Sequence, residues 1–299
     1  MLSKLDFPIP VFICHWNNPS DCLRTVQCFL KQKIPLQVSI IDNASEFDKF
    51  QFLRENLPSK VELIRLKENR GYAGGLNVLL NRWLKHGKGD FCFVSAHDAL
   101  PQDGCLEMLL ESMLKDEKIG IAYAEENGVP CVPAFHLLRG PIFLRTSPRP
   151  PGTIEQVKFC YGPILLFRKQ ALMQIGLFDE RYFTYEEDIE IGLRAQKFGW
   201  KVVIVRGAIV VNLGKSTPSD IACYLQLRNI LLMIKEYSGC HYAILRSLIS
   251  LGNTVLLLLW KSRRPVNFST YARLRAIIDF WLGRYGPPPQ CLWERKRSR

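Results

Sequence analysis

Four carboxylates occupy five consecutive positions of this chain, at Glu186, Glu187, Asp188 and Glu190. Like charges this close on a helix repel each other, so the start of a solvated helix tolerates such a run but rarely requires it. A buried carboxylate that takes a proton from a substrate hydroxyl explains the run better. Asp188 is the candidate for that general base because a helical stretch follows it.

A second cluster runs from Asn69 to Asn77 and contains Gly71, Gly74 and Gly75 ahead of an apolar helix. Glycines let a backbone approach a ligand closely, and a helix start next to Arg70 offers donors and positive potential to a diphosphate. The spacing is neither G-x-G-x-x-G nor a Walker sequence. This argues against a dinucleotide oxidoreductase or a phosphotransferase.

Two further clusters follow β-type runs. Asp42, in the turn that continues through Asn43 to Ser45, can accept hydrogen bonds from a base N–H or a ribose hydroxyl, although the same turn also suits a helix cap. Asp98 can bind a Mg²⁺ or Mn²⁺ that bridges phosphates, and His97 can join a Mn²⁺ shell. A structural turn is the alternative for His97-Asp98.

These clusters need elements that bring them together, and the first 125 residues alternate β-branched runs with helical patterns. We predict strands at 10–14, 37–41, 61–66, 91–95 and 119–123, and helices near 20–32 (capped by Ser20), 46–57, 73–86 and 103–116. A strand at 158–167, helices near 168–176 and 187–198, and strands around 201–211 complete the sheet. The pattern indicates a doubly wound, mainly parallel α/β fold whose ligands bind where the strands end.

Two regions depart from this alternation. Six prolines between 127 and 152 exclude regular helix, so we expect a long loop or flap there, which could shape a substrate pocket. Helices are predicted at 219–237, 241–261 and 269–283, and the second has fourteen uncharged residues between Arg246 and Lys261. A membrane span needs about 20, so this helix should lie in an interface or pack on the domain. We therefore divide the chain into a catalytic domain, 1–216, and a helical extension, 217–299.

The composition of the 299 residues, 47% hydrophobic and 23% charged, is that of a globular enzyme. Most of the +12 net charge belongs to the extension, because residues 213–299 hold 14 Lys and Arg against 4 Asp and Glu. That charge suits an anionic membrane surface or a solvated face. It does not favour nucleic acid, since the basic residues alternate with leucines rather than with exposed aromatics.

Ten cysteines without a C-x-x-C pair predict reduced thiols, and the first twelve residues contain no apolar core long enough for a signal peptide. We therefore expect a cytoplasmic protein.

Taken in order, the clusters resemble inverting family 2 glycosyltransferases of the GT-A fold, especially the rhamnosyltransferase-like branch. The resemblance covers nearly the whole chain and includes the Glu187-Asp188 pair. Its other motifs are Asp42-Asn43-x-Ser45, Asn69-x-Gly71-x-Ala73-Gly74-Gly75-x-Asn77, Gly176-x-Phe178-Asp179-Glu180, Arg228-Asn229 and Gly283-Arg284-x-Gly286.

The resemblance implies an enzyme that transfers a sugar from a nucleotide-diphosphate donor to a glycan or lipid-linked acceptor, with a divalent cation, Mg²⁺ or Mn²⁺. Asp188 and Glu187 would be catalytic, and Asp98 with His97 would bind the metal. The predicted nucleotide-sugar site comprises His15, Asn17, Asp42, Asn43, Ser45, Asn69, Arg70, Gly71, Gly74, Gly75 and Asn77. A lipid-linked acceptor would place the protein peripherally on the cytoplasmic face of the inner membrane.

Two departures from the family pattern qualify these roles. Ala96 stands where the first acid of the metal-binding D-x-D motif is usual, and Asn212 stands where many relatives carry a histidine. The incomplete metal motif motivates an alternative, a catalytically impaired relative that binds a nucleotide sugar as an interaction subunit. Sugar, base, acceptor, linkage and oligomeric state do not follow from the sequence.

Overall fold

The computed structural model describes residues 6–214, 217–265 and 268–294, which form two compact units. Unit 1 comprises the residues up to Pro133, Phe143–Asp179 and Asp188–Ser216; unit 2 comprises Ala134–Ile142, Glu180–Glu187 and the chain from Thr217 onward. Two short segments that we assigned by sequence to the catalytic domain thus belong to the compact unit of the C-terminal helices. The predicted limit at residue 216 lies outside the described residues.

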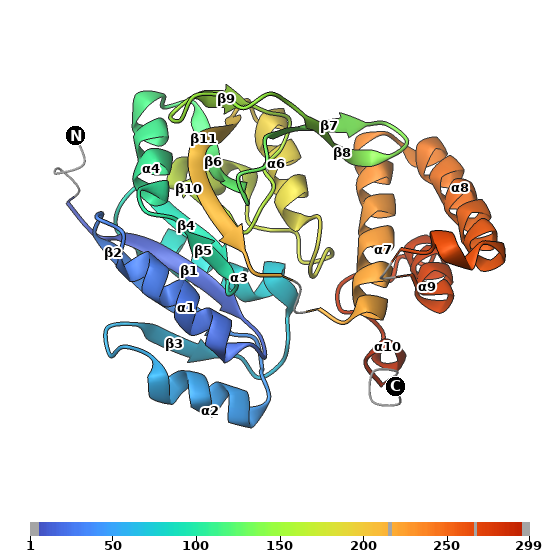
Figure 1. The fold of residues 1–299 in the computed structure, drawn as a ribbon, viewed down its shortest axis with the longest axis horizontal. Helices are drawn as coiled ribbons and strands as arrows, with labels where there is room; N and C mark the ends of the chain where they lie inside the picture. Colours follow the sequence, from blue (N-terminus) through green and yellow to red (C-terminus); the bar gives the residue numbers. More distant parts are fainter. Residues whose placement is uncertain (1–5, 215–216, 266–267, 295–299) are drawn as a thin grey trace. The chain divides into compact units, whose positions relative to one another are not determined.

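Unit 1 is built on a nine-stranded sheet with the order β3-β2-β1-β4-β10-β6-β11-β5, and β9 pairs with β11 (Figure 1). β1, β2, β3 and β4 are parallel, as are β6 and β11, whereas β5, β9 and β10 run antiparallel to their neighbours. The bounds are β1 Ile9–His15, β2 Leu36–Asp42, β3 Glu62–Arg65, β4 Phe91–Ala96, β5 Ala99–Pro101, β6 Ile119–Glu126, β9 Ile154–Gln156, β10 Ile164–Arg168 and β11 Lys201–Asn212.

Helices cover both faces of the sheet, which is the doubly wound arrangement expected. Apolar residues of α1 (Pro19–Leu30), α2 (Phe47–Asn56) and α4 (Cys105–Lys115) belong to one core cluster. Those of α3 (Gly71–His86), α5 (Lys169–Ile175) and α6 (Glu187–Lys197) belong to the other. β1 and β2 are buried almost throughout because they lie between these two layers.

The structure corrects four local predictions. Asn18, not Ser20, caps α1, because its side-chain oxygen accepts from the Asp21 N–H. α3 begins at Gly71, two residues before the predicted start at 73, so Gly71, Gly74 and Gly75 all lie inside the helix. The strand predicted at 158–167 begins only at Ile164, after the Gly162-Pro163 turn. The predicted flap contains a two-stranded hairpin, β7 (Cys131–His136) and β8 (Gly140–Arg145), since proline excludes helix but not a two-stranded ribbon.

Unit 2 contains α7 (Ser219–Tyr237), α8 (Cys240–Leu259), the 3₁₀ turn η2 (Lys261–Arg263), α9 (Thr270–Trp281) and α10 (Gln290–Glu294). α7 packs against both α8 and α9. Within the described ranges, α8 is the one helix long and apolar enough to cross a membrane by length and composition alone.

All ten cysteines lie within the described residues, and each is a free thiol. Burial raises the thiol pKa of Cys22, Cys92, Cys105 and Cys160 well above the ordinary value. These thiols behave as apolar core groups, as the sequence predicted.

Candidate active site

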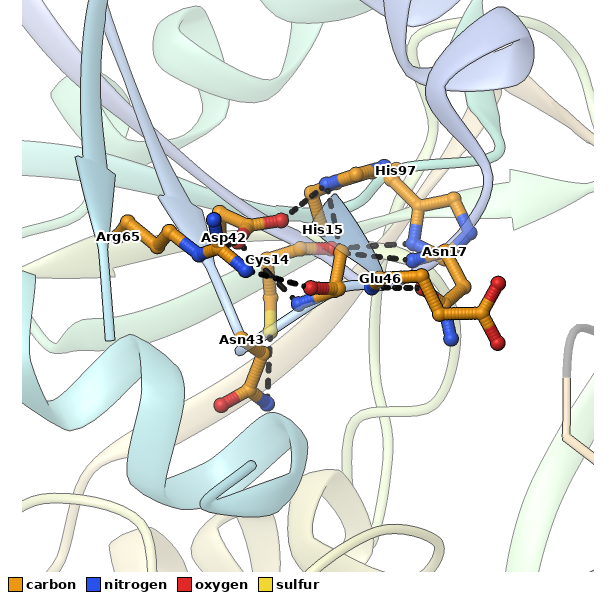
Figure 2. A network of polar contacts seen from close by, with 9 residues as sticks. Cys14, His15, Asn17, Asp42, Asn43, Glu46, Arg65 and His97 are labelled. Atoms are coloured by element: carbon orange, nitrogen blue, oxygen red, sulfur yellow. Dashed lines mark hydrogen bonds and ion pairs between the residues drawn. The ribbon is translucent and has the colours of Figure 1, made fainter. Parts of the chain in front are cut away.

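A buried histidine and aspartate meet where β1 and β2 end. The parallel register pairs His15 with Asp42, so both side chains leave the sheet at the same level. His15 Nδ1 donates to Asp42 Oδ1 at 2.9 Å, and both side chains are fully buried (Figure 2). Asp42 Oδ2 accepts from the Ser45 N–H at 3.3 Å and lies 3.6 Å from Arg65 Nε. Asp42 therefore fixes the His15 ring and the turn that follows β2.

The turn after Asp42 is joined to the turn after β1. The Asn17 N–H donates to Ser45 Oγ at 2.9 Å. Asn17 Oδ1 accepts from the Glu46 N–H at 2.7 Å (Figure 2). Asn17 has a positive φ of 55°, a conformation that asparagine tolerates better than most residues. The two turns form one polar edge at the ends of β1 and β2.

Asn43 connects this edge to the start of α3. Its Nδ2 donates to the Gly71 carbonyl at 2.7 Å, and its Oδ1 accepts from the Arg70 N–H at 2.9 Å. A Cβ added at Gly75 would lie 3.1 Å from Cys14 Sγ and 3.4 Å from Asn43 Nδ2, so this glycine allows α3 to approach β1. Arg70 is exposed beside the helix start. The arrangement presents a positive helix end and a guanidinium together.

Three remaining residues of the predicted nucleotide set have local roles. Asn69 Oδ1 accepts from the Gly71 N–H at 2.8 Å, and Gly74 is buried in α3. Asn77 exchanges two hydrogen bonds with the Phe178 backbone, at 2.9 and 3.1 Å. Asn77 thus holds the Gly176-x-Phe178 turn against α3, and its part in nucleotide binding stays a prediction.

His97 and Asp98 follow β4. His97 Nδ1 lies 3.2 Å from the Cys14 carbonyl, and its ring meets the His15 ring edge-on, with the centroids 5.6 Å apart. Burial and the charge of His15 lower the pKa of His97 to about 4, so this imidazole is neutral at pH 7. Burial raises the pKa of Asp98 to about 6, and the charges of Asp21 and Glu126 add to the shift.

Asp188, near the start of α6, is tied to the loop before β10. Its Oδ2 accepts from the Gly162 N–H at 3.1 Å, and its backbone carbonyl accepts from the Cys160 thiol at 2.9 Å. The side chain keeps some exposure, but protein surrounds its carboxylate. This desolvation raises the pKa of Asp188 to about 6, although the Gly162 and Ile189 N–H groups oppose the shift. Such a carboxylate is poised to take a proton near neutral pH.

The crowding of acids around Asp188 is partly relieved by an arginine. Arg194 forms a bidentate pair with Glu190, at 2.7 and 3.0 Å, and also donates to the Ile175 and Leu177 carbonyls. Glu190 therefore has a structural role. Glu187 is the first residue of α6 and is buried, but it belongs to unit 2 together with the segment from Glu180.

Glu126, the last residue of β6, is a site residue that the sequence reasoning missed. Its Oε1 accepts from Asn212 Nδ2 at 2.7 Å, and it also accepts from the Tyr161 hydroxyl. Its charge raises the pKa of both Asp98 and Asp188, so it lies within electrostatic range of both. It lies three residues beyond the strand predicted at 119–123, and an acid just after a predicted strand was the available signal. The charges of Asp42 and Asp98 likewise raise the pKa of the Cys22 thiol, so both lie within electrostatic range of it.

No group of three or more His, Cys, Asp and Glu side chains within residues 6–214, 217–265 and 268–294 is arranged to hold a metal ion. This does not argue against a Mg²⁺- or Mn²⁺-type ion, which often takes one or two carboxylates and completes its shell with phosphate and water oxygens. The Asp98 carboxylate is desolvated among like charges, an environment that a divalent cation would relieve. The donor set at Asp98 therefore fits such an ion.

A mainly parallel sheet with acids at its strand ends is the scaffold of GT-A glycosyltransferases, and the comparisons agree. The model of the family described as glycosyl transferase family 2 matches residues 11–176. The match covers more than half of the chain, and the chain belongs to this family of enzymes. It is 26% identical, over 71% of its length and 79% of the relative's, to the N-acetylglucosaminyl-diphospho-decaprenol L-rhamnosyltransferase of Mycobacterium tuberculosis (strain ATCC 25618 / H37Rv).

Solved structures confirm the GT-A fold. GalNAc-T7, crystallised with UDP, GalNAc and Mn²⁺, superposes with a TM-score of 0.64 at 14% identity, over 94% of this chain and 58% of GalNAc-T7. The mannosyltransferase PcManGT of Pyrobaculum calidifontis, in complex with GDP-Man and Mn²⁺, superposes with a TM-score of 0.58 at 14% identity, over 93% of this chain and 89% of PcManGT. The resemblance to family 2 glycosyltransferases of the GT-A fold, inferred from the sequence, is thus confirmed.

The raised pKa of Asp188 predicts the acid limb of the pH–rate profile. A base works only as the carboxylate, so kcat/KM should fall as the pH drops below about 6. Glu126→Gln removes a negative charge that raises this pKa, so its acid limb should move to lower pH. Glu55→Gln, a change at an exposed position of α2, should leave the limb in place. The measurement is initial rate against pH at saturating Mn²⁺.

Two results of this measurement would contradict the environment described for Asp188. One is a wild-type acid limb close to the ordinary aspartate pKa of about 3.9. The other is a Glu126→Gln limb that moves to higher pH.

Proposed function

We propose that this glycosyltransferase acts with inversion and moves a hexose, with rhamnose as the first candidate, from a nucleoside-diphosphate donor to a hydroxyl of a lipid-linked or glycan acceptor. The proposal rests on the environment of Asp188. Its carboxylate is desolvated, accepts from the Gly162 N–H, and has a pKa raised to about 6. The named relative supports both rhamnose and a polyprenol-linked acceptor.

The donor nucleotide would bind along the edge formed by the ends of β1, β2 and α3. The Asp42 carboxylate is buried, but two oxygens offer about four acceptor sites, so capacity remains for a base N–H or a ribose hydroxyl. His15, Asn17, Asn43 and Ser45 hold that edge in place. The α3 start at Gly71 and the exposed Arg70 would receive the diphosphate.

A divalent cation, Mg²⁺ or Mn²⁺, would be held by Asp98 on the side of the donor phosphates. Bound there, it would neutralise charge on the departing diphosphate. His97 is neutral and its Nδ1 lies 3.2 Å from the Cys14 carbonyl, so it packs behind the site. It would reach the ion only if its ring turned. The bound Mn²⁺ of the two structural neighbours supports this cofactor.

The reaction would be a single in-line displacement at the anomeric carbon. Asp188 takes the proton of the acceptor hydroxyl while the oxygen of that hydroxyl forms a bond to the anomeric carbon. The bond between that carbon and the diphosphate oxygen breaks on the opposite face, and Arg70 with the N–H groups of α3 receives the departing charge. The configuration is inverted because one displacement occurs.

Asp188→Asn should lower kcat by about 10²- to 10⁴-fold, the range expected for loss of a general base. Asp48→Asn, at an exposed carboxylate of α2, should leave kcat unchanged. The assay follows sugar transfer and donor hydrolysis with purified, folded variants. Near wild-type transfer by Asp188→Asn would remove the assignment. A wild-type chain that binds nucleotide but never turns a donor over would favour the alternative of a binding subunit.

A lipid-linked acceptor lies in a membrane, and α8 has a face suited to a membrane surface. Its inward side is lined by the small residues Ala243, Ser247, Ser250 and Thr254. Ser247 Oγ accepts from Trp281 Nε1 at 3.1 Å, and Thr254 Oγ1 accepts from Arg273 Nε at 2.7 Å. Its outward side carries large apolar residues that stay exposed: Ile244, Leu245, Leu248, Ile249, Val255, Leu256, Leu258 and Leu259. α8 thus has the reverse of the usual pattern for a helix in water, because its small and polar residues are buried and its leucines are exposed.

The segment that follows α8 supplies a matching charge. Trp260 is exposed, and Lys261, Arg263 and Arg264 come directly after it, with Arg263 over the Trp260 ring at 5.7 Å. Tryptophan and basic residues together suit the boundary between acyl chains and anionic headgroups. Because one side of α8 packs within unit 2, we propose that α8 lies in the plane of a cytoplasmic membrane surface and does not cross it.

The purified chain should co-sediment with vesicles that contain anionic phospholipid, more strongly at low salt. The double variant Leu248→Glu/Leu259→Glu should lose most of this binding because it places charge on the apolar face. Met173→Glu, at an apolar position of α5 that is 68% exposed, should bind as the wild type does. Absence of wild-type binding at low salt would contradict the membrane proposal, and equal loss in Met173→Glu would remove the role of α8.

A further inference from the structure

The segment Glu180–Glu187, which leads into α6, has an unusual backbone. Phe183, Tyr185 and Glu186 have positive φ angles of 64°, 72° and 70°. Residues with a Cβ atom rarely adopt this region, and three of them within four positions require support from their surroundings. Left-handed non-glycine residues of this kind concentrate at functional sites. Glu187 and Asp188 come directly after the left-handed Glu186.

Asn229, on α7, binds this segment by three backbone carbonyls. Its Nδ2 lies 2.8 Å from the Tyr182 carbonyl, 3.0 Å from that of Thr184 and 2.8 Å from that of Tyr185. The three acceptors bracket the left-handed Phe183 and include Tyr185 itself. Asn229 is fully buried, so water does not compete for these bonds.

Arg228 fixes the orientation of Asn229. Its Nε and Nη2 donate to Asn229 Oδ1 at 3.1 and 2.9 Å, which directs the amide nitrogen toward the loop. Arg228 also donates to the carbonyls of Arg181 and Tyr182, at 3.1 and 3.2 Å. Its side chain is completely buried, and each of its hydrogen bonds within the described part of the chain ends on a neutral oxygen. Such a buried cation persists only where its partners are held in place.

The motif near the end of the chain joins the same cluster. The Gly286 carbonyl accepts from Arg228 Nη1 at 2.7 Å, and the Gly286 N–H donates to the Arg181 carbonyl at 2.9 Å. Gly286 has a φ of 80°, which a glycine adopts without strain. Arg228, Asn229 and Gly286 therefore all hydrogen-bond to the same loop, although Gly286 follows Asn229 by 57 positions in the sequence.

We propose that Arg228 and Asn229 are positioning residues of the transfer reaction: they hold Glu180–Glu187 in its left-handed conformation and so set the start of α6, where Glu187 and Asp188 lie. The inference rests on the proposed role of Asp188 as the base. A displacement of about 1 Å in a reacting group can cost about 10²-fold in rate.

Asn229→Asp is the sharpest test because it keeps the shape of the side chain but turns an oxygen toward three carbonyl oxygens. We expect kcat to fall about 10²-fold, while the donor KM changes by less than about twofold because the ground-state contacts of the donor remain. Amide hydrogen exchange of residues 183–187 should accelerate. The acid limb of the pH–rate profile should move to lower pH as the Asp188 carboxylate gains water.

Arg228→Lys is the second variant, for the case that Asn229→Asp does not fold. A lysine ammonium cannot reproduce the planar fork to Asn229 Oδ1, so kcat and loop exchange should change in the same direction. Thr254→Val is the matched control, since it removes a buried hydrogen bond to Arg273 in the same unit but away from the loop. Its melting temperature should fall while kcat, the pH limb and loop exchange stay as in the wild type.

Wild-type kcat, pH limb and loop exchange in folded Asn229→Asp and Arg228→Lys proteins would overturn the proposal. So would an equal loss of kcat in Thr254→Val, because the effect would then follow stability alone. If the wild-type chain transferred no sugar, the proposed function would fail instead. The exchange rates of residues 183–187 would still decide whether the two side chains hold the loop.

Discussion

The parallel pairing of β1 with both β2 and β4 is the constraint on which the site depends. Parallel strands end at the same edge, so the pairing of His15 with Asp42, and of Cys14 with Ala96, delivers the residues after each strand to one place. The fully buried His15–Asp42 bond then fixes the turns that follow. Without this register, the acids near residues 42 and 98 would have no common neighbourhood.

Burial gives these acids their chemistry. Asp98 and Asp188 both have pKa values raised to about 6 by desolvation, yet they are suited to different tasks. Asp98 lies among the like charges of Asp21 and Glu126, so its surroundings favour a bound cation. Asp188 is held in place by the Gly162 N–H, and its raised pKa suits a carboxylate that accepts a proton. The charge of Glu126 raises the pKa of both, so one carboxylate links the protonation of Asp98 to that of Asp188.

Much of this arrangement could be predicted from the sequence, because hydrophobic periodicity and strand-end polarity are local signals. Asp42 and Asp98 follow the ends of predicted strands, and Asp188 stands out in a run of four acids before a helical stretch. The roles of Asn77, Glu190 and Glu126 could not be predicted, because each depends on a partner distant along the chain: the Phe178 backbone, Arg194 with the 175–177 carbonyls, and Asn212. The hairpin at 131–145 was missed because proline content excludes helix without indicating a ribbon. The left-handed segment before Asp188 was missed because its residue types do not favour that conformation.

The central claim is that the acids at 42, 98 and 188 surround one donor. A crystal structure with Mn²⁺ and the nucleoside diphosphate that most raises the melting temperature tests it directly. We expect an anomalous Mn²⁺ peak against the Asp98 carboxylate, the nucleoside along the Asp42–Ser45 turn, and the Asp188 carboxylate facing the open side of the diphosphate. A nucleotide bound away from that edge, or an Asp188 side chain directed away from it, would contradict the account.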